Sequence, residues 1–362
     1  MTRATAYTPD GRPGPGQLRE INLDVLQVGR AELVLPEATI RDERGGTLFD
    51  NDVLVFDPAS GGGPLVSAAA DHQARAFGVV NTAFHVQRAL RFVASLLHRP
   101  LPHLLVRIGM HDRPSWGGGH YRLPNPGNGE AIPVRPAGEV HLGRGRAFLT
   151  APGRRRYFHA PAHNAAIIYH EVGHHLCRHT ADFRLNRLRP TQRQTNTKIA
   201  LDEGCADVMT AILLRTDDIY GWHRRHIPVW DQRRRKLDPR WTMAHFHGGR
   251  HQDPHADGTV WASACWSARQ GVTAGGADPV RFDALLLRSL ELAGDDDAAS
   301  RATPTLLRRR HFSRLLAAMT RADPQLAPGV LAAMAAHGIR PGVSNSDLRK
   351  TARAEHAKAV GA

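Results

Sequence analysis

The order of the predicted elements indicates an α+β protein, with a mixed part first and a mainly helical part after it. Short strands and one long helix are predicted up to residue 142, whereas almost only helices are predicted beyond it. The 362 residues, 41% of them hydrophobic, can bury the core of one large or two modest domains. No sequence repeat interrupts this order.

Residues 1–66 are predicted to be an arm followed by a short β segment. Residues 1–18 are rich in Gly and Pro, and we expect them to be disordered. Three apolar segments between residues 21 and 56 then read as short strands, namely LDVLQV, AELVL and NDVLVFD. Three consecutive glycines and Pro64 predict a boundary after them.

Residues 67–180 are predicted to form a mixed β/α subdomain. Apolar residues recur at helical spacing from Ser67 to Leu97, and Pro100 ends this helix. Apolar segments bounded by Gly and Pro predict strands at 104–110, 117–121 and 139–142. A further helix over 162–177 completes the subdomain.

Residues 181–341 are predicted to form a helical subdomain. Periodic apolar positions predict helices at 198–214, 259–270, 281–293, 304–321 and 327–337. Residues 217–257 are rich in His, Arg and Trp and are predicted to be irregular. Residues 342–362 are polar, and we expect a flexible tail.

The formal net charge of +14 raises the question of nucleic-acid binding. Only four of the 48 basic residues are Lys, and the many Arg accompany much Ala, Gly and Pro, which is more typical of a coding bias. The basic runs at 154–156, 233–236 and 308–310 are scattered and have no interleaved aromatic residues. We interpret them as solvated faces, so nucleic-acid binding is the less favoured function.

The sequence predicts a protein that stays in the cytoplasm and does not bind membranes. It has no run of eighteen apolar residues, and its N-terminus lacks the apolar core of a secretory signal. The three cysteines, Cys177, Cys205 and Cys265, form neither a disulfide framework nor a CxxC pair. We interpret them as buried thiols in a reducing compartment.

The segment His170-Glu171-Val172-Gly173-His174 has the spacing of a metal-binding helix. Residues four apart on an α-helix share a side, so both histidines can ligate one ion. Glu171 can then reach the water at an open coordination position and act as general base. An apolar run precedes the segment, and two buried histidines beside a glutamate need a partner such as a cation.

A catalytic zinc needs a third protein ligand, for which Glu203 is the best candidate. The position six residues after His174 is not a His, and His175 and His179 are interpreted as supporting or surface groups. Glu203 and Asp207 are four apart in an apolar helical segment, which favours buried acids with a metal-related role. Asp207 would accept the outer N–H of a ligating histidine.

Three motifs in this order resemble those of the thermolysin-like gluzincins, and most closely the fungalysin group of metalloendopeptidases. HExxH is followed by E-G-x-A-D at 203–207 and by HADGTVWA at 255–262. The predicted first helix, the edge at 118–121 and the Gly-rich turn at 142–145 fall where that family has comparable elements. The resemblance covers roughly residues 67–320. It implies a zincin-like fold, with the zinc site between residues 67–180 and residues 181–341 as catalytic subdomains.

Carried over residue by residue, the resemblance implies one catalytic Zn²⁺ with Glu171 as general base. Its ligands would be His170, His174 and Glu203. His255 falls where a histidine could hydrogen-bond the oxyanion. The same loop offers three further histidines, His245, His247 and His251, and a plain polar loop is the other interpretation. The Tyr that thermolysin places soon after its second zinc histidine has no counterpart, because that stretch reads ADFRLN.

These residues together predict zinc-dependent hydrolysis of peptide bonds. A peptide or protein substrate would lie along the edge Gly118-Gly119-His120-Tyr121 by strand addition. A cytoplasmic peptidase without an inhibitory segment is expected to have narrow specificity or an activity gated by a partner. The alternative is a catalytically silent, zinc-bearing scaffold, which the presence of Glu171 disfavours because a base is not needed to hold the metal.

Overall fold

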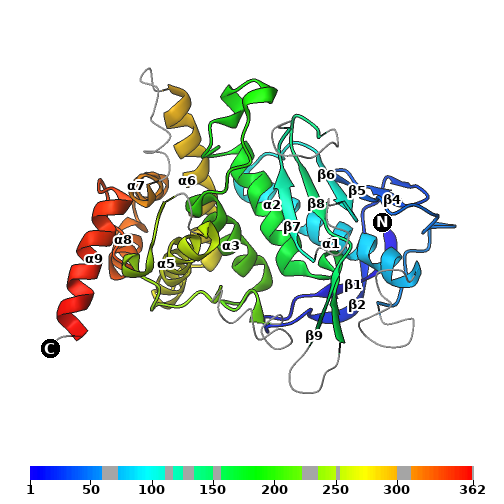
Figure 1. The fold of residues 1–362 in the computed structure, drawn as a ribbon, viewed down its shortest axis with the longest axis horizontal. Helices are drawn as coiled ribbons and strands as arrows, with labels where there is room; N and C mark the ends of the chain where they lie inside the picture. The colour runs from blue at the N-terminus through cyan, green and yellow to red at the C-terminus, as the bar shows by residue number, and fades with distance from the viewer. Residues whose placement is uncertain are drawn as a thin grey trace.

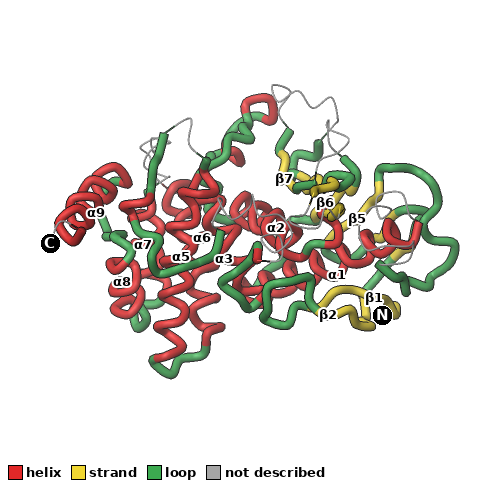
Figure 2. Tube along the Cα trace, turned by 60° about the horizontal axis from the view of Figure 1, so that its bottom comes forward, coloured by secondary structure: helices red, strands yellow, loops and turns green. Residues whose placement is uncertain are grey.

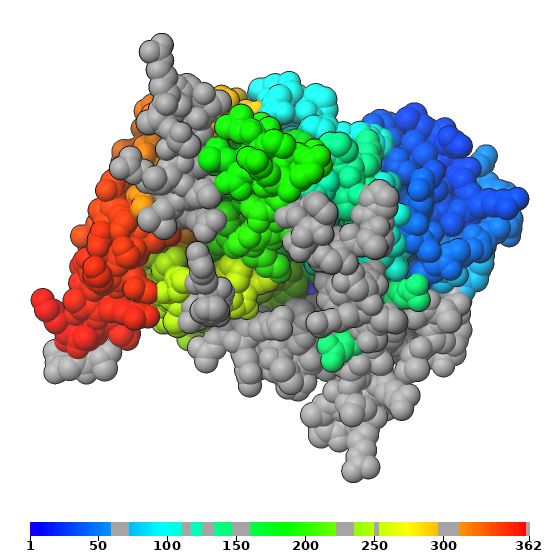
Figure 3. Space-filling model, turned by 45° about the horizontal axis from the view of Figure 1, so that its top comes forward, coloured from blue at the N-terminus to red at the C-terminus, as the bar shows by residue number. Residues whose placement is uncertain are grey.

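The strand-rich and helical parts of the chain lie at opposite ends of an elongated molecule. The computed structural model describes residues 1–58, 72–110, 117–124, 134–149, 156–221, 235–249, 253–299 and 311–360. The N-terminus lies at the end with the strands and the C-terminus at the end with the last helices (Figures 1 and 2). The same progression is visible on the described surface in Figure 3. The architecture is therefore mixed α+β, in the predicted order.

One six-stranded sheet organises the first part, in the order β3-β4-β5-β6-β8-β7. Its strands are β3 (Gln27–Val28), β4 (Glu32–Val34), β5 (Ala38–Asp42), β6 (Leu104–Ile108), β7 (Gly119–Arg122) and β8 (Glu139–Leu142). The neighbours β5, β6 and β8 are parallel, whereas β7 pairs with β8 in the antiparallel sense. Because β7 ends the order, one side of it has no partner strand within the described sheet.

Helix α1 (His72–Leu97) connects β5 to β6 and packs against β4 and β5. Val79, Val86 and Val93, each seven residues apart, are completely buried. Alternate residues of β6, beginning at Leu104, are buried in the same core. Helix α2 (Ala165–His179) packs against α1 and against β7 and β8. A small separate sheet pairs β9 (Arg146–Leu149) with β10 (Arg156–His159).

The expectation of a disordered N-terminal arm is wrong. Strand β1 (Thr2–Thr8) pairs along its whole length with β2 (Gln17–Leu23). Ala4 and Ala6 alternate on the buried face, and Tyr7 packs edge-on against Phe77 of α1. The Gly- and Pro-rich segment is the turn of this hairpin, so its composition marks a chain reversal and not disorder.

The strands expected around residues 21–56 form only in part. Residues 51–57 are not a strand, and Leu54 makes a single bridge to Ala4. Leu54 is nevertheless completely buried. The apolar residues around Leu54 in the sequence therefore indicate packing in the core and not a paired strand.

The second part is a set of helices packed on α2. They are α3 (Ala200–Leu214), α5 (Pro254–Ala274), α6 (Pro279–Ala299), α7 (Phe312–Ala322), α8 (Ala327–Ala336) and α9 (Asn345–Val360). Helix α3 lies between α2 and α5 and packs closely against both (Figure 1). The predicted helix segments at 67–71 and 304–310 lie outside the described residues. No described helix is both long and apolar enough to cross a membrane.

A glycine contact brings α3 and α5 together. A Cβ atom added at Gly204 would lie 2.6 Å from the carbonyl oxygen of Gly258. Backbone at this distance cannot yield to a side chain, so both positions require glycine. The contact sets Glu203, which precedes Gly204, beside the first turn of α5.

The prediction of a flexible C-terminal tail is also wrong for residues 345–360, which form α9. Ser344 accepts a hydrogen bond from the backbone N–H of Asp347 at the helix start. Leu348 and Ala352 are buried, and Arg353 donates to the carbonyl of Ala244. This polar segment is helical because its side chains pack against, and hydrogen-bond to, a loop about a hundred residues earlier in the chain.

Candidate metal centre

Two helices bring the predicted ligands together. Asn164 caps the start of α2 by accepting a hydrogen bond from the backbone N–H of Ala166. One turn into this helix, His170 and His174 present their Nε2 atoms to each other at 3.1 Å. The Oε2 atom of Glu203, from α3, lies 3.1 Å from His170 Nε2 and 3.4 Å from His174 Nε2. All three residues are buried.

This donor set fits a tetrahedral zinc ion. Zinc–ligand distances of about 2.0–2.1 Å require neighbouring donor atoms about 3.3–3.4 Å apart in a tetrahedron. The three donor atoms of His170, His174 and Glu203 have separations of 3.1–3.4 Å. The second oxygen of Glu203, Oε1, is buried and has no hydrogen-bond partner among the described residues. A cation among these atoms would bind their lone pairs, which would otherwise face one another without a donor.

Asp207 holds the ring of His170 in place. Its Oδ1 atom lies 2.9 Å from His170 Nδ1, so that nitrogen donates to the carboxylate and Nε2 keeps its lone pair for a metal. Arg235 donates to Asp207 through Nε at 3.0 Å and through Nη2. The guanidinium stacks over the ring of Tyr220, 4.5 Å from the ring centroid. A buried anion beside the histidine is thus neutralised by a buried cation.

Glu171 lies against the edge strand. A Cβ atom added at Gly119 of β7 would lie 2.9 Å from Glu171 Cγ and 2.8 Å from Ile167 Cγ2. Only glycine therefore lets the strand approach this carboxylate. Glu171 Oε2 is buried and has no hydrogen-bond partner among the described residues, so it can accept a proton from a bound water or substrate.

His255, in the first turn of α5, reaches the same cluster. Its Nδ1 atom lies 2.7 Å from Asp253 Oδ1, and its Nε2 atom lies 3.2 Å from Glu203 Oε2. Of the other histidines in this loop, His245 contacts Thr242 and His247 lies near Asp257. His251 lies outside the described residues.

Charges within the site shift the titration of its members. Burial opposes the charged form of His174, but Glu203 and Asp202 outweigh it and raise the pKa of this histidine to about 10. Burial likewise opposes ionisation of Glu203, yet His255 and His174 hold the pKa of its carboxyl well below the usual value. Arg235 overcomes the burial of Asp207 and lowers the pKa of that carboxyl. Without a metal, a proton on His174 balances the carboxylates, and metal binding would displace it.

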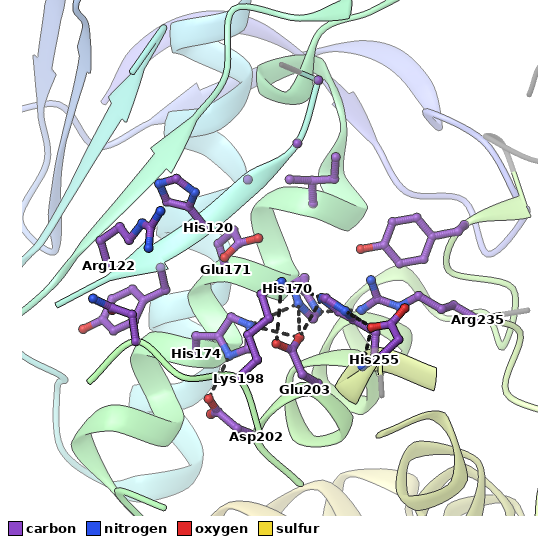
Figure 4. A pocket seen from close by; sticks show the side chains of 18 of the residues that line it. His120, Arg122, His170, Glu171, His174, Lys198, Asp202, Glu203, Arg235 and His255 are labelled. Carbon is purple, nitrogen blue, oxygen red and sulfur yellow. Dashed lines mark hydrogen bonds and ion pairs between the residues drawn. The ribbon is translucent and has the colours of Figure 1, made fainter. Parts of the chain in front are cut away.

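A cavity of about 380 Å³ opens over these residues. Figure 4 shows Glu171 on one side of it, His170, His174 and Glu203 at its floor, and His255 and Arg235 on the other side. The cavity is also lined by the backbone and side chains of the edge strand and by several cations. The lining cations include Arg122, Arg146, Arg184, Lys198 and Arg235.

The predicted edge Gly118-Gly119-His120-Tyr121 lines this cavity along β7. The Tyr121 hydroxyl donates to the carbonyl of Ala137 at 2.6 Å and lies 3.1 Å from His175 Nδ1. The hydroxyl of Tyr121 therefore links the strand to α2, while residues of the same strand line the cavity. His175 is completely buried and its Nε2 lies 2.9 Å from the carbonyl of Pro102. This histidine is thus a supporting group inside the fold.

Sequence reasoning missed two cations of the site. Arg235 belongs to a basic run that was interpreted as a solvated face, yet its side chain is buried against Asp207. The sequence could have indicated such a partner, because a buried carboxylate beside a histidine, as expected for Asp207, requires a nearby cation. Lys198, just before α3, also lines the cavity, and nothing in its local sequence indicates this.

Similarity to known proteins is found among solved structures. No protein-family model matches the chain, and no curated protein matches it. Among solved structures, the chain is similar to the precursor of protealysin, a metalloproteinase from Serratia proteamaculans. The two share 12% sequence identity with a TM-score of 0.41, over 88% of this chain and 90% of that chain. The function is therefore inferred from the residues of the site itself.

Proposed function

We propose that the protein is a zinc-dependent metallopeptidase. The observation that carries this proposal is the buried cluster of His170, His174 and Glu203, with Glu171 one residue beyond the first ligand and facing the same cavity. Two imidazoles and one carboxylate are the protein ligands of a catalytic zinc that keeps a position open. Structural zinc sites are closed by four protein ligands, and three are gathered here among the described residues.

Glu171 is the proposed general base. Zinc, when bound, lowers the pKa of a water and polarises a carbonyl. Glu171 Oε2, buried and without another partner among the described residues, then takes the water's proton as the water attacks the peptide carbonyl. Asp207 and Arg235 hold His170 in the orientation that presents Nε2.

The substrate is proposed to be an extended peptide along β7. The outer side of this strand has no partner in the described sheet and borders the cavity. Strand addition at this edge would hold a peptide through its backbone and therefore independently of its sequence. Gly119 brings that backbone close to Glu171, so a peptide bond held there would lie beside the base.

Membership of the thermolysin-like gluzincins, and of the fungalysin group within them, is the finer proposal. It is supported by the order of the three motifs and by the contact between two of them. The Gly of E-G-x-A-D and the Gly of HADG, Gly204 and Gly258, pack backbone to backbone. That contact joins the third ligand to the helix that carries His255.

The test separates metal binding from catalysis. Wild-type protein and Glu171→Gln are loaded with zinc, their zinc content is measured, and both are incubated with a diverse peptide library read by mass spectrometry. Both proteins are expected to hold one zinc, and only the wild type to cleave, with a loss of at least about 100-fold in the variant. Cleavage by Glu171→Gln at the wild-type rate would contradict the role of Glu171. A wild type that holds zinc but leaves every peptide uncut would instead support the scaffold alternative.

A further inference from the structure

Lys198 is held at the junction of the edge strand and the ligand helix. Its neighbour Asn196 accepts from the backbone N–H of Leu123 at 2.8 Å and donates to the carbonyl of Leu123 at 3.0 Å. On the other side, Ile199 is buried, and its carbonyl accepts from the backbone N–H of Glu203 in the first turn of α3 at 3.0 Å. The segment carrying Lys198 is thereby fixed to the end of β7 and to the helix of Glu203.

The ammonium of Lys198 lies at the ligand cluster. Its Nζ atom is 3.0 Å from His255 Nε2 and 4.0 Å from Glu203 Oε1. All four lysines lie in the part of the chain that the structure describes, and Lys198 is the one that lines the cavity. Its side chain is about half exposed, at 50%, so it borders the space that a substrate would occupy. Figure 4 shows it in front of His174 and Glu203.

The direction of the hydrogen bonds identifies Lys198 as the charged donor. A lysine ammonium can only donate, so His255 Nε2 accepts from it. His255 Nδ1 then carries the proton and donates to Asp253. In this arrangement Lys198 occupies the lone pair of His255 Nε2, and its remaining N–H groups carry a full positive charge at the cavity.

We propose that Lys198 is a catalytic residue that hydrogen-bonds the carbonyl oxygen of the scissile peptide as that oxygen becomes negative. The inference rests on the proposed peptidase function. When water adds to the carbonyl carbon, its proton passes to Glu171 and the negative charge appears on the former carbonyl oxygen. Lys198 stays protonated and donates to this oxygen, while Asp253 and His255 hold the ammonium in place. A fixed charge at this point stabilises the transition state more than the ground state.

Two other roles make different predictions. If Lys198 only balances the charge of Glu203, then its loss should change the affinity for zinc. If it anchors a carboxylate of the substrate, then its loss should weaken ground-state binding as much as transition-state binding. Only a donor to the oxyanion discriminates between a planar peptide and its tetrahedral, anionic analogue.

The experiment compares Lys198→Met and Lys198→Arg with Lys350→Met. Lys350 lies on α9 and pairs with Asp347 at 3.5 Å, away from the cavity, so it controls for loss of a lysine charge. Each substitution is also made in the Glu171→Gln background, where turnover does not interfere. Calorimetry then measures the Kd of a library-selected peptide and of the same peptide with a phosphinate in place of the scissile carbonyl. Chelator competition measures zinc affinity.

Lys198→Met is expected to weaken phosphinate binding and to lower kcat, each by about 100- to 1000-fold. The KM, the Kd of the peptide and the Kd of zinc are expected to change less than about threefold. Lys198→Arg should recover part of the loss because it keeps the charge, and Lys350→Met should match the wild type.

Equal weakening of peptide and phosphinate binding, unchanged phosphinate binding, or loss of zinc affinity would each overturn the role of Lys198. If the wild type cleaves no peptide, the peptidase function fails and this inference fails with it. If the wild type cleaves and Lys198→Met is unchanged, only the inference fails.

Discussion

Asp207 is placed to influence metal binding without touching the proposed ion. Its carboxylate receives a hydrogen bond from His170 and two from Arg235, all of them buried. Removing its negative charge would leave Arg235 without its anion and would free the ring of His170 to rotate. The effect on metal binding should therefore exceed that of an exposed carboxylate.

Asp207→Asn is predicted to weaken zinc affinity by about 10- to 100-fold, because the outer hydrogen bond fixes the ligand's tautomer and orientation. Competition with a fluorescent chelator measures this affinity. Asp283→Asn is the matched control, since Asp283 is equally buried and pairs with Arg269 at 2.7 Å on another part of the fold. An affinity for zinc that is the same in both variants would show that Asp207 does not serve the metal.

At the residue scale, the sequence could indicate the candidate ligands because their spacing is local. His170 and His174 are separated by one helical turn, and Glu203 and Asp207 repeat that spacing on the next helix. Arg235 and Lys198 could not be placed in this way. Each acts on a residue from another element, across a distance that depends on how α2, α3 and α5 pack.

The contact between α3 and α5 is the element-scale feature on which the site depends. Gly204 and Gly258 allow the two backbones to touch. Their neighbours include Glu203, the proposed third ligand, and Trp261, which is completely buried. Any side chain at Gly204 would separate the helices. Glu203 and His255 would then move apart.

Gly204→Ala is predicted to destabilise the metal-free protein by about 1–3 kcal/mol, the usual cost of overpacking a core. Urea unfolding followed by circular dichroism measures the change. Gly271→Ala, on the same helix pair but with no atom within 4 Å of an added Cβ, should be neutral or slightly stabilising because alanine favours helix. If both variants unfold alike, the close contact of α3 with α5 is not as described.

Elements with strong internal periodicity were predicted closely, and those that depend on distant partners were not. The helix expected over 198–214 is α3, at Ala200–Leu214. The hairpin of β1 and β2 was missed because small alanines form its buried face, which covers α1. Helix α9 was missed because its stability comes from contacts with residues 243–247 and not from an apolar stripe.

At the scale of the whole molecule, much of the positive charge has a structural use. Arg44 and Arg75 both bind Asp42, and Arg91 joins Asp24 to Glu37. These arginines connect the sheet, the N-terminal segment and α1. This use favours the interpretation of the Arg-rich surface as part of the fold, while the disfavouring of nucleic-acid binding stays a prediction.

Two histidines inside the fold make its stability sensitive to acid. His85 is completely buried, with Nδ1 2.7 Å from the Tyr169 hydroxyl, and burial lowers its pKa to about 3. Burial also lowers the pKa of His163 to about 4, while its Nε2 lies 2.8 Å from the carbonyl of Ala74. In the unfolded chain both have pKa values of about 6.5. At pH values between the folded-state and unfolded-state pKa, the unfolded chain therefore binds more protons than the folded protein.

The stability that these two histidines contribute is thus predicted to be fully present above about pH 6.5 and to fall as the pH drops toward 4. Each of the two histidines contributes about 1.4 kcal/mol per pH unit to the slope. Urea unfolding of the metal-free protein at several pH values between 4.5 and 7.5 measures this dependence. His85→Phe should reduce the slope by about the share of one histidine, even though it loses the hydrogen bond to Tyr169. An unchanged slope would mean that His85 is not held neutral.

The central claim is that two imidazoles and one carboxylate hold a single zinc ion. Cys177 and Cys205 are buried on the same two helices as the ligands, so sulfur is the competing donor. X-ray absorption spectroscopy at the zinc edge tests this most directly. We predict a shell of nitrogen and oxygen at about 2.0–2.2 Å, with the multiple scattering of two imidazoles and no sulfur. A sulfur shell at about 2.3 Å, or a shell of oxygen alone, would contradict the proposed centre.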